Sequence, residues 1–121
     1  MAAPNLVNVA TITAKSVQAA LTTTLTTEIL ANASSSGKVF KINNIIVANI
    51  DGTNAADASV AITKSGGSPI MIASTISVPA DSTLVVVDKN TALYLEEGDN
   101  IEAGAGAASD LTITINYEEL S

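Results

Sequence analysis

The chain has 121 residues, the length of one ordinary domain, and carries a net charge of −7. It contains no cysteine, histidine, tryptophan or arginine, which removes disulfides, thiolate and imidazole metal ligands, Cys and His nucleophiles, and arginine clamps on phosphate. An acidic chain is also repelled by nucleic acid, because binding there depends on neutralising phosphates. We therefore expect a protein that is not an enzyme, needs no cofactor and binds no nucleic acid.

Hydropathy and charge together favour association with other subunits. Only 14% of the residues are charged, while 47% are hydrophobic, and globular domains usually have about 25% charged residues. A small monomer with so few charges has difficulty keeping its whole surface polar. No stretch approaches the ~18 apolar residues of a membrane span, and the N-terminus lacks the pattern of a secretory signal. We expect a homo-oligomer that does not enter a membrane.

The first third of the chain is expected to contain an arm, a strand and a loop. Residues 1–15 are interpreted as an N-terminal arm or an added strand, and residues 16–121 as a single β-sandwich domain. In SVQAALTTTLTTEILA (residues 16–31), Leu21, Leu25 and Ile29 fit both a helix face and the alternation of a strand. The many threonines disfavour a helix, so we predict a strand. The loop NASSSG (residues 32–37) follows.

KVFKINNIIVANI (residues 38–50) predicts a long central strand. The core-facing residues are expected at the even positions Phe40, Ile42, Ile46, Ala48 and Ile50. Ile45 and Val47 alternate with that set, and Val85 and Val87 alternate in the same way with Leu84 and Val86. Because a small sandwich buries only one face of each sheet, a second apolar face needs a neighbouring subunit. We therefore predict that Ile45, Val47, Val85 and Val87 lie at an oligomer interface.

The rest of the chain predicts further short strands separated by turns. They are ASVAITK, IMIASTISV, STLVVVD, ALYLE, NIEAGA and DLTITINYEEL, and the turns DGTNAAD and SGGSP supply the glycines of tight connections. Val, Ile and Thr dominate these segments, and alternation in the last one is strict. We predict an all-β fold, a two-sheet antiparallel sandwich of jelly-roll or Greek-key type with about eight strands.

The acidic stretch LYLEEGDNIEA (residues 93–103) admits two interpretations. It is expected to form a hairpin in which Gly98 takes a positive φ. Its carboxylates, Glu96, Glu97, Asp99 and Glu102, suggest a calcium site, since hard cations bind several carboxylate oxygens. The spacing of a known calcium loop is absent, so a solvated turn is favoured here, and also at Asp51, Asn54 and Asp57. We predict no metal site and no catalytic site.

Other motifs are weaker. Asn32-Ala33-Ser34 matches a glycosylation acceptor, but without a secretory signal the match is most often chance. With one Phe and two Tyr, a carbohydrate site lacks the aromatic lining it generally uses. The acids gather in the last third of the chain, and Asp81, Glu96, Glu97 and Asp99 are expected to form one acidic pole of the sandwich.

Three sequence features carry a resemblance to a known group of proteins. They are the strand followed by DGTNAADASV, the VPADSTL corner, and YLEEGDNIEA followed by a last alternating strand ending in Tyr-Glu-Glu. In these features residues 37–119 resemble small virion structural proteins of tailed bacteriophages, especially T-even-like and other marine cyanophages. The L-x-x-GD-x-I element also resembles the late hairpin of trimeric jelly rolls such as tumour necrosis factor and complement-type heads.

The resemblance implies a non-catalytic part of a virion, most simply a capsid decoration (cement) protein. Such a protein would bind the outer capsid surface as a trimer, with the major capsid protein as its partner, and stabilise the shell. A neck, collar or tail accessory protein is an alternative. A host-recognition module that binds glycan or calcium is the alternative from a different functional class.

Overall fold

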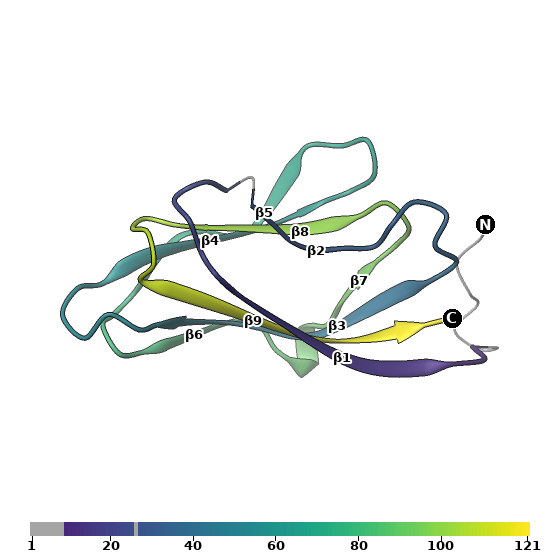
Figure 1. Ribbon diagram of the computed structural model, residues 1–121, viewed down its shortest axis with the longest axis horizontal. Helices are drawn as coiled ribbons and strands as arrows, with labels where there is room; N and C mark the ends of the chain where they lie inside the picture. The colour runs from purple at the N-terminus through teal and green to yellow at the C-terminus, as the bar shows by residue number, and fades with distance from the viewer. Residues whose placement is uncertain (1–8, 26) are drawn as a thin grey trace.

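Two antiparallel sheets face each other in the computed structural model, which describes residues 9–25 and 27–121 (Figure 1). Sheet A contains β1 (Ile12–Ala20), β9 (Leu111–Leu120), β3 (Val39–Asn49) and β6 (Thr83–Val87), in that order, and β7 (Leu93–Leu95) also pairs with β3. Sheet B contains β2 (Thr27–Ala31), β8 (Asn100–Ala105), β4 (Ala56–Thr63) and β5 (Pro69–Val78). The expected all-β, two-sheet antiparallel sandwich is confirmed.

The strand pairing is nested. β4 pairs with β5, β3 with β6 and β7, β2 with β8, and β1 with β9. The chain therefore resembles one long hairpin that is rolled up, with β1, β3, β6, β7 and β9 in one sheet and β2, β4, β5 and β8 in the other. This arrangement is a jelly roll.

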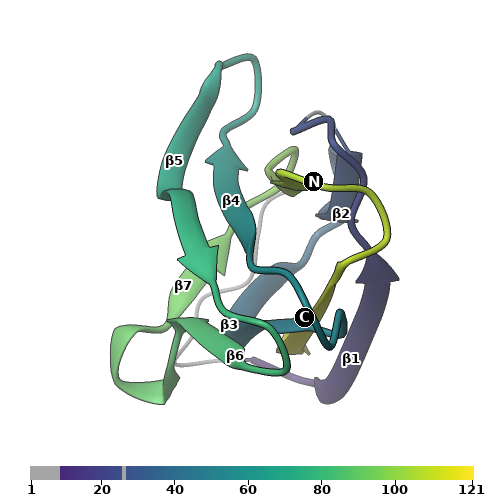
Figure 2. The same ribbon diagram turned by 90° about the vertical axis from the view of Figure 1, so that its left-hand side faces the viewer.

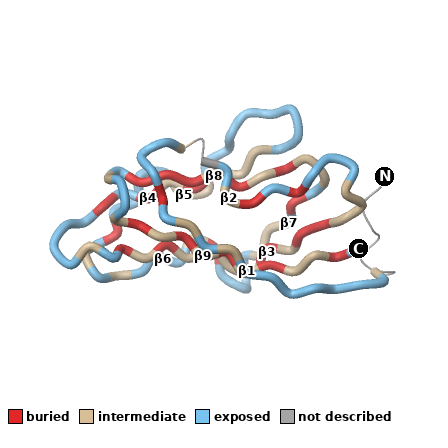
Figure 3. Tube along the Cα trace, viewed as in Figure 1, coloured by how far each residue is buried: buried red, intermediate tan, exposed pale blue. Residues whose placement is uncertain are grey.

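The core lies between the sheets and follows from the alternation of the strands. In β9 the residues at alternate positions from Leu111 to Tyr117 are buried, while the threonines between them are partly exposed. Figure 3 shows buried residues within the strands of both sheets, and exposed residues at the loops and along the start of β1. The largest fully buried apolar side chains come from both sheets: Leu21, Ile42, Ile45, Leu95, Ile101, Leu111, Ile113 and Ile115.

A β-bulge in β3 changes which residues face the core. The register with β9 shifts between Ile42 and Asn44, so one extra residue lies in β3 at that point. Beyond the bulge the odd positions face inward: Ile45 and Val47 are fully buried, while Ile50 is 62% exposed. The prediction that the even positions face the core throughout is therefore wrong after Ile42.

The burial of these residues also corrects the predicted interface. Ile45, Val47 and Val87 belong to the hydrophobic core of a single chain, with 0%, 0% and 2% exposure. They cannot form an outward apolar face. Val85 is 56% exposed and points away from the core, so it alone among the four predicted residues is accessible to a partner.

The N-terminal region differs in its boundaries. The segment predicted as one strand, 16–31, contains the end of β1 and all of β2, and residues 21–25 between them form no strand. Leu21 is buried in the core at this crossing from sheet A to sheet B. The expected domain boundary at residue 15 falls inside β1, whereas residues 1–8 of the expected arm lie outside the described residues.

The acidic stretch is not a hairpin. β7 pairs with β3 in sheet A, whereas β8 pairs with β2 and β4 in sheet B. The turn between them therefore crosses from one sheet to the other at one end of the sandwich. The predicted hairpin pairing is wrong because two alternating segments that flank a turn have the same sequence pattern whether they pair with each other or with different sheets.

Candidate functional site

The acidic turn is organised around one buried carboxylate. Asp99 is 2% exposed, and its Oδ2 accepts hydrogen bonds from Lys64 Nζ at 2.5 Å and from the backbone N–H of Glu96 at 2.9 Å. Its Oδ1 accepts the backbone N–H of Ser65 at 3.0 Å. Asp99 thus joins the β7–β8 turn to the turn after β4.

This environment shifts the acidity of both members of the ion pair. Burial by itself raises the pKa of Asp99, but the hydrogen bonds from Lys64, Glu96 and Ser65 outweigh it, and the pKa lies below 3.8. The hydrogen bond to Asp99 raises the pKa of Lys64 above 10.5. Both groups are therefore charged at neutral pH, and Asp99 is a structural carboxylate that has no free oxygen for a second role.

Asn32 completes the same end of the sandwich. Its side chain is 1% exposed and donates to the carbonyl oxygens of Lys38 at 2.8 Å and Leu95 at 3.1 Å. Its Oδ1 accepts the hydroxyl of Ser36 at 2.6 Å. That Asn32 is not glycosylated stays a prediction. In the structure its side chain holds the loop after β2 against the end of β7 through these hydrogen bonds.

Gly98 precedes Asp99 in the turn, and its backbone N–H donates to the carbonyl oxygen of Asn32. It has the positive φ that the sequence predicted, +85°. A Cβ at this position would lie 2.7 Å from Ser65 Oγ and 2.8 Å from Ser65 Cβ. Glycine is therefore required here both by the backbone conformation and by the close approach of the neighbouring turn.

The opposite end of the sandwich has its own bracing asparagine. Asn49 is 3% exposed, and its side chain donates to the carbonyl oxygens of Asn54 at 3.0 Å and Val78 at 2.9 Å. Asp81 donates its backbone N–H to the carbonyl of Asp51 at this end. Asp81 is thus separated from Glu96, Glu97 and Asp99 by the length of β3, and the predicted single acidic pole is wrong.

The remaining acidic side chains do not converge on a metal position. Asp51 Oδ1 accepts the backbone N–H of Thr53 at 2.8 Å, and this hydrogen bond lowers the pKa of Asp51. Thr63 donates its hydroxyl to Glu102, and the backbone N–H of Gly37 donates to Glu97. Within residues 9–25 and 27–121, no three acidic side chains are close enough to hold a metal ion.

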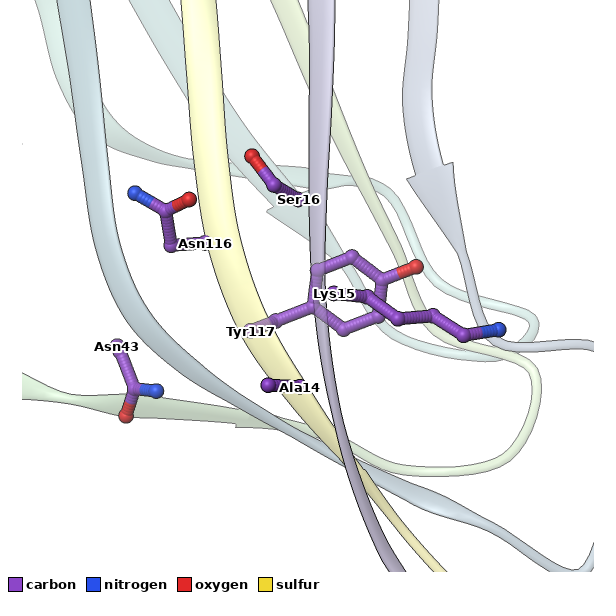
Figure 4. A pocket seen from close by; sticks show the side chains of 6 residues that line it. All are labelled: Ala14, Lys15, Ser16, Asn43, Asn116 and Tyr117. Carbon is purple, nitrogen blue, oxygen red and sulfur yellow. The ribbon is translucent and has the colours of Figure 1, made fainter.

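A hollow of about 350 Å³ lies on sheet A and is lined by residues of β1, β3 and β9 (Figure 4). Its lining residues are Ala14, Lys15, Ser16, Asn43, Asn116 and Tyr117. In Figure 4, Asn43 and Asn116 lie on one side of β9, Ser16 lies between β9 and β1, and the side chains of Lys15 and Tyr117 extend past β1. The hollow offers uncharged amides and a hydroxyl, without a nucleophile and base in contact.

The lysine that borders this hollow belongs to a structural ion network. Lys15 Nζ lies 2.9 Å from Glu119 Oε2, and Lys38 Nζ lies 3.1 Å from Glu119 Oε1. Glu119 therefore forms ion pairs with two lysines at one end of sheet A, one in β1 and one directly before β3. Neither lysine is isolated in an apolar pocket, which is the environment that would activate an amine for covalent chemistry.

The most unusual surface is apolar. Strands β5, β6 and β7 carry exposed large hydrophobic side chains, and Figure 2 shows these strands together on one side of the molecule. We call this surface the β5–β7 apolar side. Its exposed members are Ile70, Met71, Ile76, Val85 and Tyr94.

The sequence analysis predicted that Val85 faces a partner, but it did not predict the exposed apolar side chains of β5. The signal that was available is the stretch from Ser65 to Ala80, which contains no charged residue and includes the unbroken apolar run Ile70-Met71-Ile72. Such a run does not alternate, so at least one of its side chains must point away from the core.

No protein-family model matches this chain, and no curated protein is significantly similar to it in sequence. In the described part of the chain, no helix has the length and apolar character needed to cross a membrane.

Proposed function

We propose that this chain is a non-catalytic structural subunit of a tailed-bacteriophage virion, most simply a capsid decoration protein. In this role it binds the outer capsid surface as a homo-oligomer and stabilises the shell. The β5–β7 apolar side is the observation that carries the proposal, because large apolar side chains that are exposed on three strands at one side of a small domain mark a surface that binds a partner.

Two further observations support the proposal. The polar clusters built from Asp99, Asn32, Asn49 and Glu119 all have structural partners, which fits a protein whose role is mechanical. The jelly roll is a common architecture of viral capsid domains. The resemblance of residues 37–119 to phage virion proteins selects the virion over other assemblies and implies a trimer.

Quantitative mass spectrometry of purified virions tests the proposal. A decoration protein should be present at a copy number that is a fixed and large fraction of that of the major capsid protein. A neck, collar or tail location predicts only a few copies per particle. Absence of the chain from virions purified free of host protein would overturn the proposal.

A further inference from the structure

A second hollow, of about 200 Å³, lies on the outer face of sheet B, and we call it the sheet B hollow. Its floor contains Ser59 of β4 and Gly104 of β8, which are register partners. Ser59 lies between two buried residues of β4, so its own side chain points outward. Residues 23 and 25, from the segment that joins β1 to β2, form one wall, and Thr75 of β5 forms the other.

Gly104 lets the joining segment approach the sheet closely. A Cβ at position 104 would lie 3.0 Å from the backbone nitrogen of Leu25 and 3.1 Å from its Cα. A side chain there would crowd this backbone, so the wall of the hollow depends on glycine. The half-buried side chain of Leu25 gives this wall an apolar surface.

The opposite wall is held in a strained conformation. Thr75 has a φ of +47°, which β-branched residues rarely adopt. Its backbone N–H donates to Ser59 Oγ at 2.9 Å, and the register with β4 shifts at this point, so that β5 bulges. A bulge redirects a side chain, and local backbone strain is often found at functional sites. Here both features bring Thr75 to the edge of the hollow.

The charge around the hollow is negative. Asp57 lines it and is exposed, and within the described residues its carboxylate has no hydrogen bond or ion pair. The strands of sheet B carry Glu28, Asp57 and Glu102 but no lysine. Glu28 and Glu102 are register partners, and like charges in such a position destabilise a sheet. A cation from outside the chain would relieve this repulsion.

The groups that line the hollow match an ammonium ion on an apolar stem. An ammonium has three donors and no acceptor, and Asp57 supplies a carboxylate while Thr23 and Thr75 supply hydroxyl oxygens from the two walls. The stem of a lysine can lie along the apolar surface of Leu25. An anion would be repelled by Asp57. A sugar ring would find no aromatic side chain to stack on among the described residues that line the hollow.

We propose that the sheet B hollow binds the ammonium group of a lysine side chain from a partner protein. The inference goes beyond the proposed function, because it holds for whichever assembly contains the chain. A single exposed ion pair contributes little to binding, so one isolated lysine should bind with millimolar affinity. A partner protein gains the rest of its affinity from contacts around that lysine.

Nuclear magnetic resonance of the ¹⁵N-labelled protein at low ionic strength tests the site. The probe is the blocked peptide acetyl-glycyl-lysyl-glycinamide. The backbone amide signals of Ser59, Thr75 and Gly104 should shift and reach saturation, whereas the glutamine analogue of the peptide should leave them in place. Shifts that do not saturate, or that spread evenly over all acidic residues, would overturn the site. Equally tight binding of the arginine analogue would overturn the assignment to an ammonium group.

A pair of matched variants separates the site from general attraction to an acidic protein. Asp57→Asn and Glu118→Gln each remove one negative charge, and Glu118 lies in β9 of sheet A. Asp57→Asn should weaken peptide binding by about tenfold, as expected for the loss of a charge-assisted hydrogen bond. Glu118→Gln should change it by less than about twofold. Equal losses for the two variants would overturn the proposal.

Thr75→Gly tests the strained wall. Glycine accepts the positive φ of this position and removes only the side chain, so the bulge should persist and circular dichroism should match the wild type. Peptide binding should weaken by roughly threefold, as expected for the loss of one hydroxyl acceptor. Unchanged binding would overturn the role of Thr75 as a ligand-contacting residue.

Discussion

Lys64 Nζ lies 2.5 Å from Asp99 Oδ2, and this ion pair joins the turn after β4 to the turn that crosses from sheet A to sheet B. The two partners are unequal, because the side chain of Asp99 is 2% exposed and that of Lys64 is 45% exposed. The carboxylate is therefore the buried member, and its loss leaves the N–H groups of Lys64, Ser65 and Glu96 without their shared acceptor.

Replacing Asp99 by Asn should destabilise the protein by about 2 to 3 kcal/mol. The amide has one acceptor oxygen for three donors and brings its own N–H₂ group to a position that is 2% exposed, and a polar group left unsatisfied in a buried position costs ~1 to 3 kcal/mol. Lys64→Met should cost less than about 1 kcal/mol, because a half-exposed ammonium is screened by water. Chemical denaturation measures both free energies of unfolding, and equal losses for the two variants would contradict the assigned roles.

The same carboxylate predicts a loss of stability in acid. The pKa of Asp99 in the folded protein lies below its unfolded value, near 3.8, so the unfolded chain binds the proton first as the pH falls. The stabilisation is fully present above that value and is lost as the pH falls through the folded pKa.

Melting temperatures of the wild type and Asp99→Asn between neutral pH and pH 2 check this. The advantage of the wild type should shrink below about pH 4, in line with the usual pKa of Asp. Asp57→Asn, at an exposed position in β4, serves as the control and should follow the wild-type curve. A wild-type advantage that grows in acid would show that the sign is wrong.

Two glycines separate backbone strain from steric overlap. Gly98→Ala adds a Cβ 2.7 Å from Ser65 Oγ at a φ of +85°, whereas Gly66→Ala adds one at +72° with no atom within 4 Å. Strain at a positive φ costs ~1 to 2 kcal/mol, so Gly66→Ala should lose about that much. Gly98→Ala should lose more in the same denaturation measurement, and the reverse order would contradict the described packing of the two turns.

The acidic turn should be insensitive to neutralising its outer carboxylates. Glu96 is exposed and Glu102 is partly exposed, and Gln at position 102 keeps an acceptor for the Thr63 hydroxyl. The double variant Glu96→Gln and Glu102→Gln should change the free energy of unfolding by less than about 1 kcal/mol. EDTA should leave the wild-type melting temperature unchanged. A marked drop with EDTA would reveal a metal site.

The bulge in β3 makes neighbouring valines respond differently to charge. Val47 is 0% exposed and Val85 is 56% exposed, although both lie where β3 and β6 pair. Val47→Lys buries an ammonium and should cost more than about 4 kcal/mol, enough to remove the cooperative thermal transition. Val85→Lys should keep the wild-type circular dichroism spectrum. A folded Val47→Lys variant would contradict the assignment of Val47 to the core.

The strands themselves could be predicted from the sequence because their cause is local. Alternation from Leu111 to Tyr117 and the positive φ of Gly98 both depend on residues that are close in sequence. Seven strands after residue 37 were expected, and the structure has β3 to β9 there. The fold class follows from this pattern.

What the sequence left open depends on contacts between distant residues. One extra residue near Asn43 reverses the phase of Ile45 and Val47, and period-two alternation does not reveal a bulge. The pairing of β7 with β3 and the position of β5 at the edge of sheet B likewise depend on contacts between distant residues. The apolar run at Ile70 indicated that something was unusual there, but its exposure depends on how far sheet A extends beneath β5.

Cryo-electron microscopy of the intact virion tests the central claim most directly. If the chain is a decoration protein, its jelly roll should fit density on the outer capsid surface as trimers. Density for this chain restricted to the neck or tail would contradict the capsid assignment. Complete absence of the chain from the virion would contradict the structural role.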